Sequence, residues 1–321
     1  MMKEKLIILF LALWIQSCTD YPGQMPGSRT ETLSSGWKML PAGRLGGTDE
    51  QSISENGFDT DSWYEAIVPG TVLGSMATTG VIEDPYSGIN MQRVDPEQFK
   101  QPWWFRTTFH LSPKDVSKNV SLRFNGINYR ADLWVNGKKV VGKDQFAGTY
   151  RMFTFPVNDF IREGENTVAL KMWPHADGEY SIGFVDWNPL PRDRNLGIFR
   201  EVFMEINKGI KLRSPFVYSK VNTETKNAAE LFIQTEIENN TDNAVSGLVR
   251  VNYELGEVEK EVSLRPGETL SCRFTPDEFK QLSVKNVKLW WPNGMGNPDM
   301  YRFTTEFIAG GQVLDRVEKK Y

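Results

Sequence analysis

Apolar and polar residues alternate with a period of two along much of this chain. Residues 120–124, 131–135 and 168–172 each place an apolar side chain at every second position. Such alternation is typical of a strand with one buried face. Because short strands of this kind are separated by turn residues, the pattern predicts an all-β sandwich.

Two local signals refine this picture. Asn136-Gly137 directly follows the alternating run 131–135 and predicts a tight hairpin turn. The only good helix candidate of this region is Thr71–Thr79, which follows Pro69-Gly70. A helix there would place Val72, Leu73 and Met76 on one face.

A second β pattern begins after a boundary expected near residues 210–215. About 105 residues with some seven short strands match the size of an immunoglobulin-like sandwich. Arg265-Pro266-Gly267-Glu268 is expected to form a turn between two of these strands. The runs that predict strands are 231–238, 248–255, 258–264, 269–274 and 301–307.

The N-terminus has the pattern of an export signal. Lys3 and Lys5 precede an unbroken apolar run over 6–15, which is too short for a transmembrane helix. The run ends in Ile-Gln-Ser-Cys, which resembles a bacterial lipoprotein signal. We therefore predict a signal peptide over 1–17, Cys18 as the lipid-bearing residue and a polar tether over 18–35. The alternative is an ordinary secretory signal that contains a cysteine. Either interpretation predicts export, to the periplasm or to the outer membrane and cell surface.

The amino-acid composition limits the kinds of ligand and site that this chain can have. The formal net charge is −4, which argues against a broad nucleic-acid-binding face. With two histidines and two cysteines, the chain has little material for a Cys/His zinc site, a thiol nucleophile or a disulfide framework, and we predict no metal and no cofactor. Cys272 is expected to be a buried small hydrophobe. The 10 tryptophans and many carboxylates suit a carbohydrate ligand.

The strand pattern stops over residues 173–197, where aromatic side chains are interleaved with carboxylates, amides and arginines. Such a long irregular segment in a compact domain predicts a functional loop. Flat aromatic walls with a few polar groups are what a sugar needs. Alternatively, the aromatics seal a domain edge and the charges are solvated. Asp177, Glu179 and Asp186 are candidate carboxylates for glycoside hydrolysis, but their spacing does not show that role. His175 is interpreted as a loop residue rather than a metal ligand.

Several motifs, in this order, resemble family 2 glycoside hydrolases, in particular the branch of exo-β-glucosaminidases and β-mannosidases. Each motif alone is modest, whereas their order and spacing are specific. They are Val68-Pro69-Gly70-Thr71-Val72-Leu73, Asp84-Pro85-Tyr86, Pro102-Trp103-Trp104-Phe105-Arg106, the run 124–137, Asp186-Trp187-Asn188-Pro189, Gly197-Ile198-Phe199-Arg200-Glu201-Val202, and Leu289-Trp290-Trp291-Pro292-Asn293-Gly294-Met295-Gly296.

The resemblance implies a galactose-binding-like jelly-roll domain over 36–212 and an immunoglobulin-like β-sandwich over 213–321. In the family, a (β/α)₈ barrel follows and carries both catalytic glutamates, one of them in an Asn-Glu pair. This sequence contains no Asn-Glu dipeptide. We therefore expect the barrel to be missing and assign no catalytic residue.

The resemblance also implies substrate-binding residues. In the mannosidase branch, an Asp-Trp loop of the first domain lines the terminal-sugar pocket, and the matching positions here are Asp186, Trp187 and the next candidate, Asn188. The Asp-Trp-Asn-Pro form resembles the glucosaminidase branch. Trp290-Trp291-Pro292 is expected to pack between domains.

Three hypotheses follow. The leading one is the non-catalytic N-terminal part of an exported family 2 glycosidase, whose intact form hydrolyses β-glucosaminides or β-mannosides. The alternative is a stand-alone glycan-binding surface lipoprotein without hydrolase activity. The third is a scaffold for a separately encoded barrel. All three predict a β-linked oligosaccharide or glycoprotein glycan as ligand, no nucleic acid, and membrane contact only through the lipid anchor.

Overall fold

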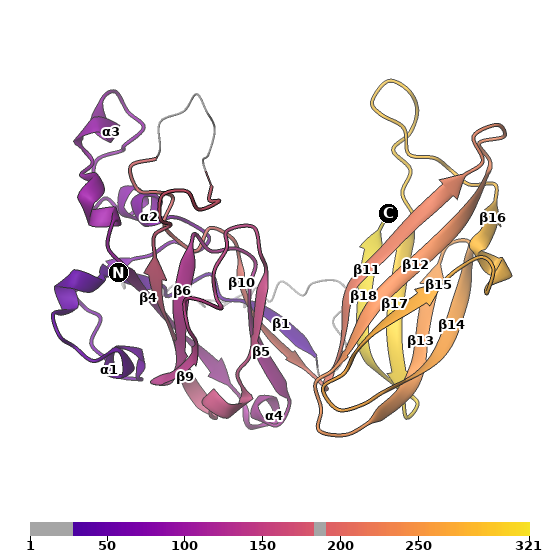
Figure 1. Ribbon diagram of the computed structural model, residues 1–321, viewed down its shortest axis with the longest axis horizontal. Helices are drawn as coiled ribbons and strands as arrows, with labels where there is room; N and C mark the ends of the chain where they lie inside the picture. The colour runs from indigo at the N-terminus through magenta and orange to yellow at the C-terminus, as the bar shows by residue number, and fades with distance from the viewer. Residues whose placement is uncertain (1–27, 183–190) are drawn as a thin grey trace, which may run out of the picture.

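The computed structural model describes residues 28–182 and 191–321, which form two lobes along the long axis of the molecule (Figure 1). Each lobe is built from two β-sheets, and every strand pair in the described part of the chain is antiparallel. The predicted all-β class, with a jelly-roll sandwich followed by an immunoglobulin-like one, is confirmed.

The first sandwich pairs a four-stranded sheet of order β1-β10-β5-β8 with a six-stranded sheet of order β3-β2-β4-β9-β6-β7. Short helices lie at the ends and on the outer face of the larger sheet (Figure 1). The strands are β1 (Arg29–Thr32), β2 (Lys38–Pro41), β3 (Tyr64–Glu65), β4 (Trp103–Leu111), β5 (Asn119–Phe124), β6 (Arg130–Val135), β7 (Lys138–Val141), β8 (Phe153–Pro156), β9 (Gly164–Trp173) and β10 (Val202–Asn207). The helices are α1 (Glu50–Ser54), α2 (Val72–Thr78), α3 (Asn90–Arg93) and α4 (Pro113–Val116), with 3₁₀ turns at Ala42–Leu45, Pro96–Phe99 and Asn158–Phe160.

The core of this sandwich lies between its two sheets. β5 buries every second side chain, as the alternation predicted, because its other face meets solvent. β6 and β9 are buried on both faces. Their outer face is covered by a second apolar cluster in which Ile53 of α1 packs with Trp104 and Trp134.

Both local predictions are confirmed. The helix α2 begins after Thr71, whose hydroxyl oxygen accepts a hydrogen bond from the Gly74 amide at 3.0 Å and caps the helix. Asn136 and Gly137 both have positive φ angles and join β6 to β7 in a two-residue hairpin.

The second sandwich packs β11-β12-β15, with β16 also paired to β12, against the sheet β14-β13-β17-β18. Its core is a separate apolar cluster between these sheets. The strands are β11 (Ile210–Val221), β12 (Ala228–Asn239), β13 (Val245–Tyr253), β14 (Gly256–Leu264), β15 (Thr269–Phe274), β16 (Ser283–Lys285), β17 (Arg302–Ala309) and β18 (Gln312–Lys320), and a 3₁₀ turn covers Lys280–Leu282.

Cys272 of β15 is buried in this core, as the sequence predicted. Burial raises the pKa of its thiol to about 11, because the apolar surroundings disfavour the charged thiolate. We expect Cys272 to react with Ellman's reagent only after unfolding. The measurement is made in the Cys18→Ser variant, where Cys272 is the single thiol. Rapid reaction in native buffer would contradict the buried position.

The segment expected to be a tether, 18–35, is partly structured. Residues 29–32 form β1, which pairs with β10 at the edge of the four-stranded sheet. The run Arg-Thr-Glu-Thr has no apolar alternation, so sequence pattern did not reveal it. Its stability comes from backbone hydrogen bonds to a neighbour that is distant in sequence. Leu33, which follows it, is buried.

The two sandwiches meet at residues 208–209, between the end of β10 and Ile210, slightly before the expected start of the second domain at 213. A buried carboxylate, Glu205 of β10, lies at this junction. It binds Arg123 of β5 at 2.7 Å and approaches Lys211 and Arg213 of β11 at 3.7 and 3.8 Å. An ion cluster therefore links the two sandwiches.

None of the helices within 28–182 and 191–321 is long and apolar enough to cross a membrane.

Candidate functional site

The long loop that follows β9 begins where the sequence predicted. β9 ends at Trp173, and neither 174–182 nor 191–197 forms a helix or an extended strand. Asp186, Trp187 and Asn188 lie outside the described residues, as does Cys18. Their roles stay predictions, and the structure instead shows how the two ends of the loop are held.

The entry to the loop is anchored on β6. The Trp173 indole Nε1 donates a hydrogen bond to the Asp132 carboxylate at 2.9 Å. Burial alone would raise the pKa of Asp132, but hydrogen bonds from Lys139 and Trp173 lower it below its ordinary value. Asp132 therefore stays ionised and holds the last residue of β9.

The next turn is fixed by charge. Glu179 forms an ion pair with Arg130, the first residue of β6. The other oxygen of the Glu179 carboxylate accepts a hydrogen bond from the Ala176 amide at 2.7 Å. Both oxygens of Glu179 are thus engaged, and the side chain acts here as a support for the loop rather than as a free acid or base.

The exit from the loop is anchored by Asn128, which is fully buried. Its side-chain Nδ2 donates hydrogen bonds to the carbonyls of Arg194 and Asn195 at 2.9 and 3.0 Å. Its Oδ1 accepts a hydrogen bond from the Thr149 hydroxyl at 2.7 Å. The Asn128 amide and carbonyl also pair with Gly197. One side chain therefore joins three segments that are far apart in sequence.

Further contacts tie the exit of the loop to its entry. Arg194 donates to the His175 carbonyl at 2.8 Å and pairs with the Asp177 carboxylate at 3.2 Å. The Asn195 side chain donates to the Ile182 carbonyl at 3.4 Å. The base of the loop is consequently closed by side chains from both ends, which is the kind of support a binding loop needs.

The N-terminus of α2 receives the end of the loop. The amides of Gly70 and Val72 donate to the carbonyls of Ile198 and Leu196, both at 2.8 Å. A Cβ atom on Gly197 would lie 2.4 Å from the Gly70 carbonyl oxygen, so this close approach requires glycine. Asp193 lies in the same exit segment of the loop, and burial raises the pKa of its carboxyl group.

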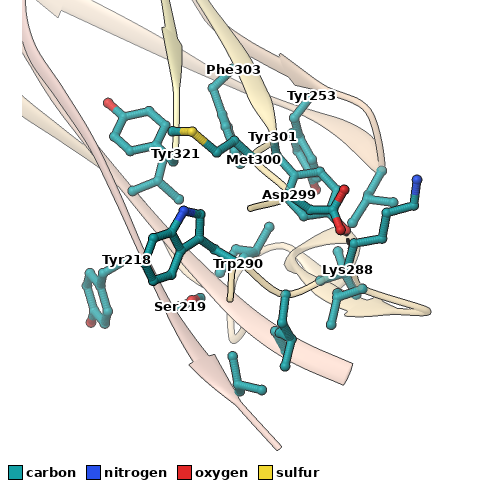
Figure 2. A pocket seen from close by; sticks show the side chains of 18 of the residues that line it. Tyr218, Ser219, Tyr253, Lys288, Trp290, Asp299, Met300, Tyr301, Phe303 and Tyr321 are labelled. Atoms are coloured by element: carbon teal, nitrogen blue, oxygen red, sulfur yellow. Dashed lines mark hydrogen bonds between the residues drawn. The ribbon is translucent and has the colours of Figure 1, made fainter. Parts of the chain in front are cut away.

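A second candidate feature is an apolar pocket of about 560 Å³ in the second sandwich. Figure 2 shows Trp290 in the middle of this pocket, with Tyr218, Met300 and Tyr321 around it. Trp290 is 59% exposed, which is unusual for so large an apolar side chain. The polar groups on the lining include Ser219 and Asp299.

No group of three or more potential metal ligands occurs within the residues that the structure describes.

Comparison with known proteins defines the class. A family model described as "Glycosyl hydrolase 2 galactose-binding domain-like" matches residues 49–177, within the first sandwich. A second model, "Glycosyl hydrolases family 2", matches residues 210–321, which is the second sandwich. The two models together cover about three quarters of the chain. The chain belongs to glycoside hydrolase family 2.

Individual relatives show which enzymes of the family this chain is similar to. The exo-β-D-glucosaminidase of Amycolatopsis orientalis is 32% identical over 275 residues, which cover 85% of this chain and 26% of that enzyme. The exo-β-D-glucosaminidase of Hypocrea jecorina is 30% identical, over 85% of this chain and 31% of that enzyme. The mannosylglycoprotein endo-β-mannosidase of Lilium longiflorum is 27% identical, over 88% and 32%. This chain therefore spans about a quarter to a third of the length of these relatives.

Solved structures agree. The exo-chitosanase CsxA of Amycolatopsis orientalis aligns over 91% of this chain and 33% of its own, with a TM-score of 0.82 and 29% identity. A complex of a single-residue variant of that enzyme with PNP-β-D-glucosamine aligns with a TM-score of 0.83 and 30% identity. Both sandwiches and their order are thus shared with an enzyme of this family.

Sequence reasoning located the loop but missed the residues that hold it. Asn128 and Arg130 lie within the motif run 124–137, but neither they nor Arg194 carry a predicted role. The available signal was the polar Asn128 between the apolar runs 120–124 and 131–135. A buried asparagine in that position indicates side-chain bonds to backbone groups.

Proposed function

We propose that this chain provides the non-catalytic, glycan-handling part of a family 2 glycosidase that acts on β-glucosaminides or β-mannosides. The catalytic (β/α)₈ barrel would come from a further segment of polypeptide, joined beyond Tyr321 or encoded separately. The observation that carries this proposal is the match of both sandwiches to the leading quarter to third of exo-β-D-glucosaminidases.

The apolar pocket around Trp290 supports the proposal. It lies in the second sandwich, and Tyr321, the last residue, is part of its lining (Figure 2). A polypeptide that continues from Tyr321 starts at this surface, and burying an exposed tryptophan and Met300 there stabilises an interface. The expectation that Trp290-Trp291-Pro292 packs between domains concerns the same surface and stays a prediction.

The experiment joins residues up to Tyr321 to the part of the Amycolatopsis orientalis exo-β-D-glucosaminidase that follows its matched segment. We expect this chimera to hydrolyse 4-nitrophenyl β-D-glucosaminide, and the isolated 321-residue chain to show no hydrolysis above buffer. The barrel segment alone is the control for activity that does not need the two sandwiches.

Two outcomes would contradict the proposal. One is hydrolysis of aryl β-glycosides by the isolated chain at an ordinary enzymatic rate. The other is a folded chimera that hydrolyses neither β-glucosaminides nor β-mannosides. The Trp290→Ala chimera tests the pocket separately, because loss of domain contact lowers thermal stability while the sugar site is untouched.

We assign substrate contact to Asp186, Trp187 and Asn188 on the family resemblance. Asp186 would accept hydrogen bonds from sugar hydroxyls or from an amino group, and Trp187 would supply an apolar wall. In the chimera, Asp186→Asn is expected to lower kcat/KM about tenfold, since a charge-assisted hydrogen bond to substrate is lost. Asp144→Asn, which replaces an exposed carboxylate in another loop, is the matched control. An unchanged kcat/KM for Asp186→Asn would remove Asp186 from the site.

We further infer that the chain is exported and that Cys18 carries the lipid anchor. The support is the charged N-terminus, the apolar run 6–15 and the Ile-Gln-Ser-Cys sequence. In a bacterial host, Cys18→Ser is expected to move the protein from the membrane fraction to the soluble periplasmic fraction. The mass of the extracted wild-type protein reports the lipid, and an unmodified mature N-terminus would exclude lipidation.

A further inference from the structure

Two tyrosines form an exposed pair beside the base of the long loop. Tyr150 lies between β7 and β8, and Tyr180 lies in the loop after β9. Their ring centroids are 5.3 Å apart and the ring planes are inclined by 52°. Tyr150 is 62% exposed and Tyr180 is 74% exposed, so the pair contributes little to the core.

Each tyrosine directly follows a residue whose side chain bonds to the short segment 128–130. Thr149, next to Tyr150, is buried and donates its hydroxyl to Asn128. Glu179, next to Tyr180, is ion-paired with Arg130. The two anchors are two residues apart, since Arg130 is the first residue of β6 and Asn128 lies just before that strand. The rings are therefore presented to solvent from a backbone held in place by hydrogen bonds and charge.

The polar groups around the pair favour one class of ligand. Asp177 lies in the turn just before Tyr180, and its side chain is 87% exposed. Within the described residues its only ion pair is with Arg194, at 3.2 Å. It can therefore turn one oxygen toward an added cation. An aromatic pair and an exposed carboxylate in the turn that precedes one of its rings match a sugar ring with apolar C–H faces and a protonated amino group.

We propose that Tyr150 and Tyr180 form an aromatic platform for a pyranose ring of a β-linked glucosamine oligomer. One ring stacks on the face of the sugar, the other, inclined to it, contacts the edge of the sugar, and Asp177 in the preceding turn receives an ammonium group of the oligomer. This rests on the proposed function, because it takes its substrate class from that proposal. It adds a binding contact in the first sandwich to Asp186 and its neighbours. The platform needs the aromatic rings but not their hydroxyl groups, and it needs no group from another domain.

Isothermal titration of the full 321-residue chain with a fully deacetylated glucosamine hexamer, at mildly acidic pH, tests the platform. The double variant Tyr150→Ala/Tyr180→Ala is expected to weaken binding about tenfold, since two ring contacts are lost. The double variant Tyr150→Phe/Tyr180→Phe should bind within twofold of the wild type. Tyr86→Ala is the matched control, because Tyr86 is 78% exposed and lies in another loop.

A second probe isolates the carboxylate. Asp177→Asn should weaken binding of the glucosamine hexamer severalfold but leave binding of the N-acetylglucosamine hexamer unchanged, because only the former carries ammonium groups. Circular dichroism confirms that each variant is folded. The platform is wrong if the wild-type chain binds neither oligomer, or if the double alanine variant binds as tightly as the Tyr86→Ala control.

Failure of this inference and failure of the proposed function give different results. An active chimera whose sandwiches bind no oligomer through the tyrosines removes the platform and keeps the proposed function. Tyrosine-dependent binding by a chain whose chimera is folded but inactive keeps the platform and favours a stand-alone glycan-binding protein.

Discussion

Replacing Asn128 with alanine is expected to destabilise the first sandwich by about 4 kcal/mol. The substitution leaves three polar groups without their partner, namely the hydroxyl of Thr149, which is buried, and the carbonyls of Arg194 and Asn195, which are partly buried. Each buried group left unsatisfied costs about 1–3 kcal/mol, and a small cavity adds to the loss.

Hydrogen exchange followed by mass spectrometry measures this effect in each sandwich separately. We expect protection to fall in β5, β6 and residues 191–198, and to stay unchanged in the second sandwich. Asn125→Ala is the control, because Asn125 is only half-buried and its side chain contacts Arg123 and Glu201 rather than the loop. Equal losses in the two variants would show that Asn128 does not hold the loop.

Replacing Glu205 with glutamine is expected to cost about 3 kcal/mol, because it leaves buried or half-buried cations without their counter-charge. Arg123, Lys211 and Arg213 all face this carboxylate, and their side chains are less than a quarter exposed. Arg213 keeps a second partner, Glu238, at 3.0 Å, which limits the loss. Glu201→Gln is the matched control, since Glu201 is exposed.

The loss of stability in the Glu205→Gln variant is expected to depend on pH. Burial alone would raise the pKa of Glu205, but the charges of Lys211 and Arg123 hold it below the ordinary glutamate value. A carboxyl with a depressed pKa stabilises the fold above its unfolded pKa, and this contribution is lost as the pH falls through the folded value. The difference in unfolding free energy between wild type and Glu205→Gln should therefore be largest near neutral pH and shrink in acid.

Urea unfolding at several pH values measures this difference. Asp315 of β18 is a further carboxyl near this junction, and burial raises its pKa, with the charge of Glu205 contributing in the same direction. Removing the Glu205 charge lets Asp315 ionise more readily beside Lys211. A difference that grows on acidification would contradict the assigned role of Glu205.

Local features could be predicted because they depend on neighbours in the sequence. The Thr71 cap, the helix after it and the Asn136-Gly137 hairpin each follow from the conformational preferences of a few adjacent residues. The strand β1 was missed because Arg-Thr-Glu-Thr buries little, and its stability depends on pairing with β10 far along the chain.

In the candidate site, too, local features could be predicted from the sequence and long-range contacts could not. The loop over 173–197 was predicted from the end of an alternating pattern and from its mixture of aromatic and charged residues. Its supports could not be predicted, because Asn128 bonds to a carbonyl 66 residues away and Arg130 to a carboxylate 49 residues away. The exposure of Tyr150 next to Tyr180 also depends on packing between distant segments.

The amino-acid sequence alone determined the class of this protein: two β-sandwiches, their order, the loop between β9 and β10, and the resemblance to family 2 glycoside hydrolases. Periodicity and turn chemistry suffice for the sandwiches and the loop because they are repeated along the chain, whereas the resemblance rests on the motifs and their order. Only the tertiary structure decided that Asn128 and Arg130 hold the loop, that Glu205 links the sandwiches, and that Trp290, Tyr150 and Tyr180 face solvent. These depend on which distant side chains meet, and neither composition nor spacing encodes that proximity.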